Sequence, residues 1–360
     1  MTGIPPNPMA GVALHSVGAL LSANCYAPQK YLRQWSWEVF WMTQAFWCWF
    51  MLPIIGALVT IPELGAVLSE APREPMIYSF LMGLAYGVGG TSFNISIRYI
   101  GFSLTYAIAV GLSAVLGSLV PPLVRGELAE ILARTGSGWV IAGVAVGALG
   151  IAVCGFAGRL KEVDLRQAGE TGQFSLIKGL ALSFVAGLLS AVYGFALEVA
   201  QPVIDVAAAH GAGHWKGNVA YLFANTGAFV TATAYSLYLS LRNRTLGELT
   251  YLPGRGGARR LAANHLLSLM TGTLWYGQFF FYNLGHVRMG QYAFTSWAIH
   301  MIMLVLFSNL LAVVFREWKG TRPTTRAAIA AGLLVLVASV LLLTYGNYLG
   351  GSADASSSGG

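Results

Sequence analysis

The spacing of charged residues constrains the fold of this chain more than any other feature of its sequence. Its 360 residues include only 21 Lys and Arg and 14 Asp and Glu, and these leave ten charge-free stretches of 19 or more residues. A helix needs about 20 apolar residues to cross a hydrocarbon core about 30 Å thick. The ten stretches therefore predict an all-α membrane protein with ten transmembrane helices. They are 1–29, 39–62, 75–97, 99–124, 135–158, 179–197, 217–241, 261–287, 289–315 and 327–353.

The composition excludes several classes of protein. Charged residues make up 10% of the chain, against about 25% in ordinary soluble domains. Because the net charge of +7 comes from residues between the apolar stretches, it does not predict a nucleic-acid partner. The sequence has no metal-binding, phosphate-binding or nucleophile motif, so we expect neither an enzyme nor a bound metal or cofactor. Cys25, Cys48 and Cys154 are predicted to be reduced packing residues.

The basic residues predict how the chain is oriented. The connections after the first, third, fifth, seventh and ninth stretches hold 16 Lys and Arg, whereas the alternate connections and the two termini hold 5. Lys and Arg gather in cytoplasmic loops. Both termini are therefore expected on the periplasmic side.

Two short patterns recur along the chain and predict an internal repeat. Residues 20–23, Leu-Leu-Ser-Ala, recur 168 positions later at 188–191, and Phe93-Asn94 corresponds to Tyr282-Asn283, 189 positions later. Each pair falls at the same place in each group of five stretches. An odd number of spans per repeat inverts one repeat relative to the other, an architecture common in secondary transporters.

This repeat predicts the domain organisation. We expect a first five-helix repeat over 1–158, a charged cytoplasmic connector over 159–175 and a second five-helix repeat over 176–349. The remaining residues, 350–360, are small and polar and are expected to be disordered.

Two further patterns concern helix packing and the cytoplasmic face. Gly83 with Gly87, and Gly143 with Gly147, have the spacing that lets helices approach closely. Residues 255–260, Arg-Gly-Gly-Ala-Arg-Arg, either anchor the chain at the cytoplasmic face or bind a phosphate or lipid head group. The anchor is the simpler interpretation.

Several polar and aromatic side chains are predicted to share one layer inside the membrane. At 1.5 Å per residue, His15, Gln278 and His300 lie about 9–12 Å below the outer rim, close to the depth of Trp275 and Trp297. Buried polar groups in a membrane are costly and therefore candidates for function. Further candidates for the same cavity are Gln44, Tyr86 and Tyr193, with Thr43 and Trp47 beside them.

This mixture of side chains suits a neutral sugar. Sugar hydroxyls need fixed donors and acceptors, and sugar C–H faces stack on aromatic rings. An anion would require a buried Lys or Arg and a hydrophobic cation a central carboxylate, and no stretch contains either. Each aromatic ring could instead serve only packing, and His15 and His300 could simply make hydrogen bonds between helices.

A second cluster is predicted toward the cytoplasmic side. Lys30, Glu38, Asn94 and Arg98 are candidates for an inner gate in which Glu38 pairs with Lys30 or Arg98. Alternatively, Glu38 is a first-turn acid that follows the helix N-cap Ser36 and stabilises the helix dipole.

The residues of these clusters resemble those of a known family. The matching residues are His15, Gly18, Tyr26-Ala27-Pro28, Lys30, Trp35-Ser36-Trp37-Glu38, Arg98-Tyr99, Gly101, Trp275-Tyr276, Gln278 to Tyr282, Gly285-His286, Arg288, Ser296-Trp297 and His300. This set resembles the L-rhamnose–proton symporters of the drug/metabolite transporter superfamily, whose members share a ten-helix inverted-repeat fold. The resemblance is dense in the first four stretches and in the eighth and ninth.

The resemblance implies import of L-rhamnose or a related 6-deoxyhexose, driven by protons, across the bacterial inner membrane by a monomer with alternating access. Histidine titrates near neutral pH, so His15 and His300 are the leading candidates for the proton carrier, followed by Glu38. An exporter of sugars or metabolites, an uncoupled facilitator, a channel and a scaffold remain the alternatives.

Overall fold

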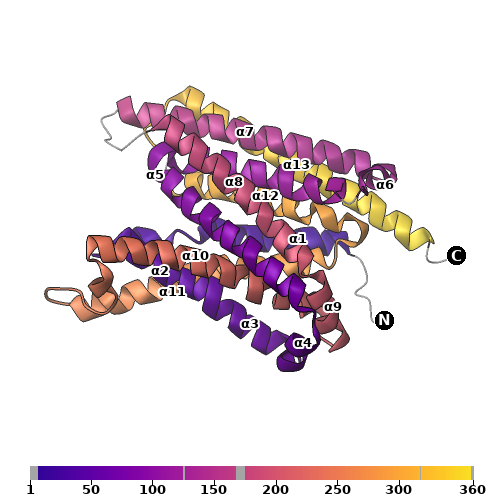
Figure 1. Cartoon of the computed structure of the whole chain (residues 1–360). Coiled ribbons are helices and arrows are strands. Elements are labelled where there is room, and N and C mark those ends of the chain that lie inside the picture. The colour runs from indigo at the N-terminus through magenta and orange to yellow at the C-terminus, as the bar shows by residue number, and fades with distance from the viewer. Residues whose placement is uncertain (1–6, 125, 168–174, 317, 358–360) are drawn as a thin grey trace. The chain divides into compact units, whose positions relative to one another are not determined.

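The computed structural model describes residues 7–124, 126–167, 175–316 and 318–357, and every regular element in them is helical (Figure 1). The elements of the N-terminal half are α1 (Pro8–Asn24), η1 (Pro28–Tyr31), α2 (Trp37–Ala45), η2 (Phe46–Met51), α3 (Leu52–Thr60), α4 (Leu64–Glu70), α5 (Arg73–Val124), α6 (Leu128–Ala133) and α7 (Ser137–Gln167). Those of the C-terminal half are α8 (Leu176–Val199), α9 (Gln201–Ala209), η3 (Gly213–Val219), α10 (Ala220–Asn243), η4 (Leu246–Leu249), α11 (Gly257–His286), η5 (Gly290–Thr295), α12 (Ser296–Val314) and α13 (Pro323–Ser357).

Five segments of the described chain are long and apolar enough to cross a membrane. They are Trp37–Thr60, Ser137–Leu165, Ile177–Ala209, Ser296–Val314 and Pro323–Leu349. Each overlaps one of the ten charge-free stretches. The other stretches are also helical, in α1, α5, α10 and α11, but these helices are shorter or carry more small polar residues.

The helix α5 folds back on itself within its 52 residues. Ser96 Oγ lies 3.1 Å from Thr105 Oγ1, although nine residues of straight helix would separate them by about 13 Å. The rings of Phe93 and Tyr106 are 4.9 Å apart for the same reason. The sequence predicted separate helices over 75–97 and 99–124. The structure has one assigned helix, with a sharp reversal near that boundary.

The second predicted span contains a π-helical segment, η2, between α2 and α3. Pro53 follows it at the start of α3. Proline lacks an N–H group, and its ring clashes with the carbonyl four residues before it. A local widening of the helix relieves that clash and shifts the residues around the helix axis.

The chain divides into two compact units, which we describe separately. The first unit comprises 1–23, 89–194 and 281–360, and the second comprises 24–88 and 195–280. In the second unit α3, α4, α9 and η3 share a tightly packed apolar core. Its buried residues are Ala57, Ile61, Val67, Ala71, Ala200, Val203, Ile204, Ala207, Ala212, Val219 and Ala220.

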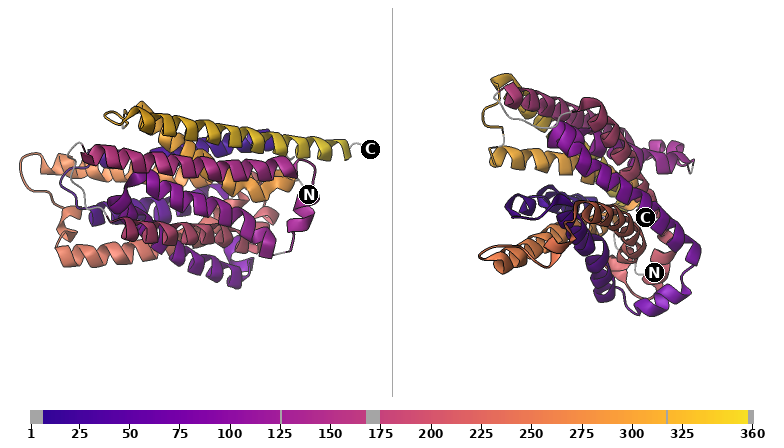
Figure 2. Two further views of the ribbon diagram at one scale, coloured as in Figure 1. Left: turned by 90° about the horizontal axis from the view of Figure 1, so that it is seen from above. Right: turned by 60° about the vertical axis from the view of Figure 1, so that its left-hand side comes forward.

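In the first unit α7 runs alongside α13 (Figures 1 and 2). A Cβ atom built on Gly143 would lie 2.9 Å from the backbone nitrogen of Leu343, and one built on Gly147 would lie 2.7 Å from Ser339 Oγ. Ser339 Oγ donates a hydrogen bond of 2.7 Å to the Gly143 carbonyl. The predicted close approach at these glycines is confirmed.

Two segments of the predicted domain scheme, the connector and the C-terminal tail, are more helical than expected. The helix α7 continues to Gln167, well into the connector predicted over 159–175, and residues 168–174 lie outside the described part. The helix α13 continues to Ser357, although a disordered tail was expected from residue 350.

Close packing in the second unit gives a stability prediction. A Cβ atom on Gly87 would lie 2.7 Å from the Ala228 carbonyl oxygen on α10, so we expect Gly87→Ala to destabilise the protein by about 1–3 kcal/mol. Nothing in the described structure lies within 4 Å of a Cβ atom built on Gly65 in α4. Thermal unfolding in detergent should therefore show a lower midpoint for Gly87→Ala than for the unsubstituted protein. The midpoint of Gly65→Ala should not be lowered. Equal midpoints would contradict the packing.

Candidate functional site

The first unit contains a cluster of aromatic rings around His15, which we call the histidine cluster. The His15 ring on α1 lies 5.1 Å from the Tyr282 ring on α11 and 6.1 Å from the His300 ring on α12. Tyr282 is also 5.6 Å from both His300 and Trp297. The sequence predicted His15, Trp297 and His300, and the structure brings them together around Tyr282.

His15 is the least satisfied polar group of this cluster. Its side chain is fully buried, and neither ring nitrogen has a hydrogen-bond partner among the residues that the structure describes. A buried polar atom without a partner costs about 1–3 kcal/mol. Close contact explains the burial, because a Cβ atom on Gly285 would lie 3.0 Å from His15 Nε2. An unsatisfied polar group buried in a membrane protein is a candidate for function.

Trp297 is held by hydrogen bonds to the second arm of α5. Its Nε1 donates to both the carbonyl oxygen and the hydroxyl of Ser113, each at 3.1 Å. The ring also rests on Gly117, where a Cβ atom would lie 2.6 Å from the indole. Tyr193, another predicted residue, is buried with its ring 6.2 Å from that of Trp297. Trp297 is therefore fixed in position within the cluster.

The second unit contains a separate cluster of aromatic rings, which we call the indole cluster. The Trp275 ring lies 5.1 Å from Trp49, 6.1 Å from Tyr86 and 5.0 Å from Phe279. The predicted amides Gln44 and Gln278 belong to the same unit and are buried. Gln44 Oε1 accepts a weak hydrogen bond of 3.8 Å from Cys48 Sγ.

Sequence periodicity identified Trp47 and missed Trp49. On a regular α-helix, Trp47 lies on the same face as Gln44. The π-helical segment changes this register: Trp47 packs against Gly272 and is half-buried, whereas Trp49 is almost fully buried against Trp275. Tyr282 was also missed, although its position four residues after Gln278 indicates the same helix face.

The predicted gate residues are divided between the units. In the second unit, the buried Glu38 carboxylate accepts hydrogen bonds from Asn243 Nδ2 (2.9 Å) and Thr245 Oγ1 (3.0 Å). Ser36 is the N-cap residue of α2, as expected, but its hydroxyl makes no capping bond. Lys30 is exposed in the second unit. In the first unit, Asn94 is buried and Arg98 is exposed.

The chemistry of the two clusters suits a neutral ligand. Their members are aromatic rings, imidazoles and amides, and none carries a permanent charge. In the second unit the indole nitrogens of Trp41 and Trp49 are buried and have no hydrogen-bond partner among the described residues. Among all the residues that the structure describes, no group of three or more His, Cys, Asp or Glu could hold a metal ion. The cysteines are free and buried, as predicted.

Comparison with known proteins identifies the family. The family model described as L-rhamnose-proton symport protein matches residues 7–347. This chain belongs to that family. It is 32% identical over 344 residues to the L-rhamnose-proton symporter of Mannheimia succiniciproducens, covering 94% of this chain and 98% of the relative. It is 31% identical over 341 residues to that of Cronobacter sakazakii, covering 92% and 96%. Together with its apolar helices, this makes the chain a multi-pass membrane protein of a transporter family.

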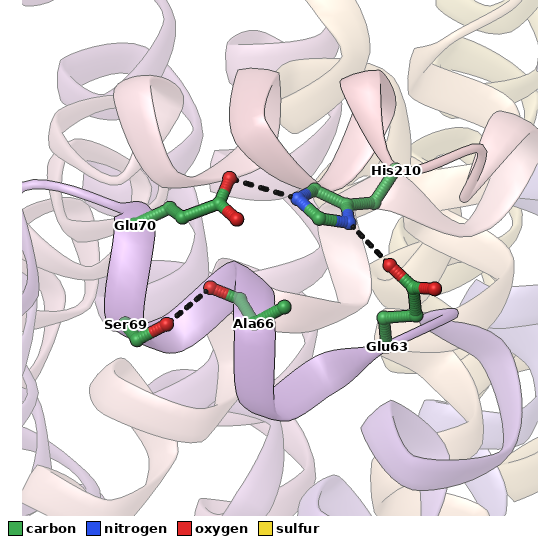
Figure 3. Close-up of polar contacts among 5 residues, drawn as sticks. All are labelled: Glu63, Ala66, Ser69, Glu70 and His210. Carbon is green, nitrogen blue, oxygen red and sulfur yellow. Dashed lines mark hydrogen bonds and ion pairs between the residues drawn. The ribbon is translucent and has the colours of Figure 1, made fainter.

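An ionisable cluster lies outside the spanning segments of this symporter-family chain. His210, just after α9, contacts Glu63 Oε2 through Nδ1 at 3.1 Å and Glu70 Oε2 through Nε2 at 3.0 Å (Figure 3). Only the protonated ring can donate from both nitrogens. The hydrogen bonds to Glu70 and Glu63 raise the pKa of His210 above its ordinary value of about 6.5. The protonated ring therefore ties α9 to both ends of α4.

This contact predicts a pH-dependent stability. A raised pKa in the folded state stabilises the fold fully below about pH 6.5, and the contribution disappears as the pH rises through the raised value. We expect His210→Gln to lower the unfolding temperature at pH 5.5 to 6.5 and to match the unsubstituted protein at alkaline pH.

The exposed His214, in the adjacent connection, provides a matched control for this measurement. His214→Gln should leave the pH profile of unfolding unchanged. A difference between His210→Gln and the unsubstituted protein that is the same at every pH would contradict the ionic contact.

Proposed function

We propose that this protein imports L-rhamnose, or a related 6-deoxyhexose, together with a proton across the bacterial inner membrane by alternating access. Family membership and the names of the relatives support the substrate and the coupling ion. The observation that carries the proposal is the histidine cluster, in which His15 is fully buried with both ring nitrogens unpartnered among the described residues. Such a group can bind a proton or a sugar hydroxyl.

Contacts between connections support a chain that crosses the membrane ten times. If it does, the odd-numbered connections share one face. In the second unit, the connection after the first stretch reaches the start of the eighth, where Arg33 N donates to Asn264 Oδ1 at 3.2 Å. In the first unit, Asp164 at the end of the fifth stretch accepts a hydrogen bond of 2.9 Å from Arg322 N, which follows the ninth. Both contacts join connections of the same parity.

Contacts on the opposite face obey the same alternation. Asn7, before the first stretch, donates from its backbone to the carbonyl of Arg288, after the eighth, at 2.9 Å. His210, after the sixth stretch, contacts Glu63, after the second. A missed or additional crossing would separate such partners by about the 30 Å of the hydrocarbon core. Because this face holds few Lys and Arg, we assign it, with both termini, to the periplasm.

The unit boundaries support the inverted repeat. The first unit contains stretches one, four and five from the first half of the chain and stretches six, nine and ten from the second half. Stretches two and seven belong to the second unit. The chain leaves the first unit after positions 23 and 194, which differ by 171, and leaves the second after 88 and 280, which differ by 192. The recurring sequence patterns have offsets of 168 and 189. Equivalent segments of 1–158 and 176–349 therefore contribute to each unit.

The proposed sugar-binding residues are His15, Gln44, Tyr86, Tyr193, Trp275, Gln278, Trp297 and His300, with Trp49 and Tyr282 added from the structure. For the inner gate we propose Lys30, Glu38, Asn94 and Arg98. The hydrogen bonds of Glu38 to Asn243 and Thr245 connect the start of α2 to the end of α10. A change in this contact is one way to open or close the cytoplasmic side. We propose that the protein acts as a monomer.

Sugar binding can be tested in the indole cluster. We expect Trp275→Ala and Gln278→Ala to weaken L-rhamnose binding about 5- to 150-fold, because each removes an interaction worth about 1–3 kcal/mol. Isothermal titration of the purified protein against a panel of neutral sugars measures this. Trp139→Ala is the control, since Trp139 lies on α7 of the first unit and half of its side chain is exposed. Unchanged affinity in both cluster variants would exclude this cluster as a sugar site.

Proton coupling can be tested in the histidine cluster. A proton that crosses the membrane contributes about 2.3 kcal/mol per 100 mV, which supports about a 50-fold accumulation of sugar. Without the proton carrier, a symporter should still exchange sugar for sugar but should no longer accumulate it. We expect His15→Gln or His300→Gln to retain counterflow in liposomes and to lose uptake driven by a pH gradient.

His214→Gln should retain both activities. If both cluster variants still accumulate sugar, Glu38 becomes the leading carrier. If the unsubstituted protein never accumulates sugar under a proton gradient, symport is wrong and a facilitator or exporter explains the fold.

A further inference from the structure

A pocket lined by arginines lies at the start of α11 in the second unit. Its volume is about 440 Å³, within the range of small-ligand sites. The lining residues are Tyr31, Arg33, Gly256, Arg259, Arg260, Ala263 and Asn264. Three of these carry a guanidinium group and none carries a carboxylate. The pocket is therefore strongly cationic.

The connection before α11 is folded around one of these arginines. Arg260 donates from Nη1 to the Arg255 carbonyl and from Nη2 to the Pro253 carbonyl, each at 2.9 Å. Gly254 and Gly256 have φ values of +87° and +80°, which favour glycine. These bonds hold the guanidinium in place, and its Nε is buried with no hydrogen-bond partner among the described residues.

A second connection is fixed against the first and brings another arginine to the pocket. The side chain of Asn264 accepts from Arg33 N at 3.2 Å and donates from Nδ2 to the Arg33 carbonyl at 2.8 Å. Asn264 is almost fully buried, so this pair of bonds is protected from water. The side chains of Arg33 and Arg259 remain exposed and available.

These observations point to an anion with several acceptor oxygens. Guanidinium groups match the geometry of phosphate, and the start of the 30-residue helix α11 adds the positive end of its dipole. We propose that this pocket binds a phosphate group, supplied either by the head group of an acidic phospholipid or by a soluble phosphate. Neither the sugar nor the proton of the proposed transport cycle needs such a site.

The position of the pocket relates it to the membrane surface. Arg33 lies shortly before α2 and Arg259 lies in the first turn of α11, so both are near the starts of helices proposed to cross the membrane. Tyr31 is 72% exposed at the same pocket. Juxtamembrane arginines attract acidic lipids by about 1 kcal/mol each. The same attraction also acts on arginines outside the pocket, and the experiment must separate the two effects.

The matched pairs are Arg33→Gln/Arg259→Gln, inside the pocket, and Arg242→Gln/Arg244→Gln, exposed in the same basic connection outside it. Both pairs remove the same charge. Purified full-length protein in neutral detergent is titrated with phosphatidylglycerol, phosphatidylcholine or inorganic phosphate at constant ionic strength. Native mass spectrometry counts bound lipid, and thermal unfolding measures stabilisation.

We expect phosphatidylglycerol to stabilise the unsubstituted protein, and we expect the affinity of the pocket pair to fall about 10-fold further than that of the outer pair, because only the pocket pair loses charge-assisted hydrogen bonds to the phosphate. The outer pair should fall much less. Stabilisation by inorganic phosphate with the same dependence on Arg33 and Arg259 would also support the site and identify the soluble source. Equal losses in the two pairs, or no preference for phosphatidylglycerol or phosphate over phosphatidylcholine, would overturn the proposal.

Discussion

The structure depends on the inability of a hydrocarbon core to satisfy backbone polar groups or unpaired charges. The described chain accordingly folds as helices, and its charged residues lie outside the ten long charge-free stretches. Polar contacts within the helical layers come from small hydroxyl groups instead. Ser96, for example, joins the two arms of α5 to α8 through Ser183 Oγ at 2.6 Å. Charged groups instead make their contacts at helix ends and in connections, as Glu38, Asp164 and His210 do.

Helices without a hydrophobic driving force between them must fit closely to attract one another. Glycines permit this fit at Gly87 against α10 and at Gly143 against α13. The same device shapes the histidine cluster, because Gly117 admits the Trp297 indole and Gly285 admits the His15 ring. Rings held by such contacts have little conformational freedom left to lose when a ligand binds beside them.

Much of this arrangement could be predicted from the sequence, because charge spacing and glycine spacing report directly on membrane helices. His15, Trp297 and His300 were placed in one layer by counting residues along helices, and the structure brings their rings together. Periodicity failed where the helix is irregular. The π-helical segment turns Trp49 toward Trp275, and the reversal of α5 occurs without a break in its helical assignment. Neither irregularity can be read from apolar residues that recur every 3.6 positions, as on a regular α-helix.

The sequence also could not predict how the polar layer is divided between compact units. The titratable rings, His15 and His300, belong to the first unit, whereas the amides Gln44 and Gln278 belong to the second. Amides offer donors and acceptors that do not change with protonation, whereas an imidazole can also gain or lose a proton. The transport cycle proposed above needs both kinds of chemistry. Because the two sets belong to different compact units, a substitution in one set leaves the immediate surroundings of the other unchanged.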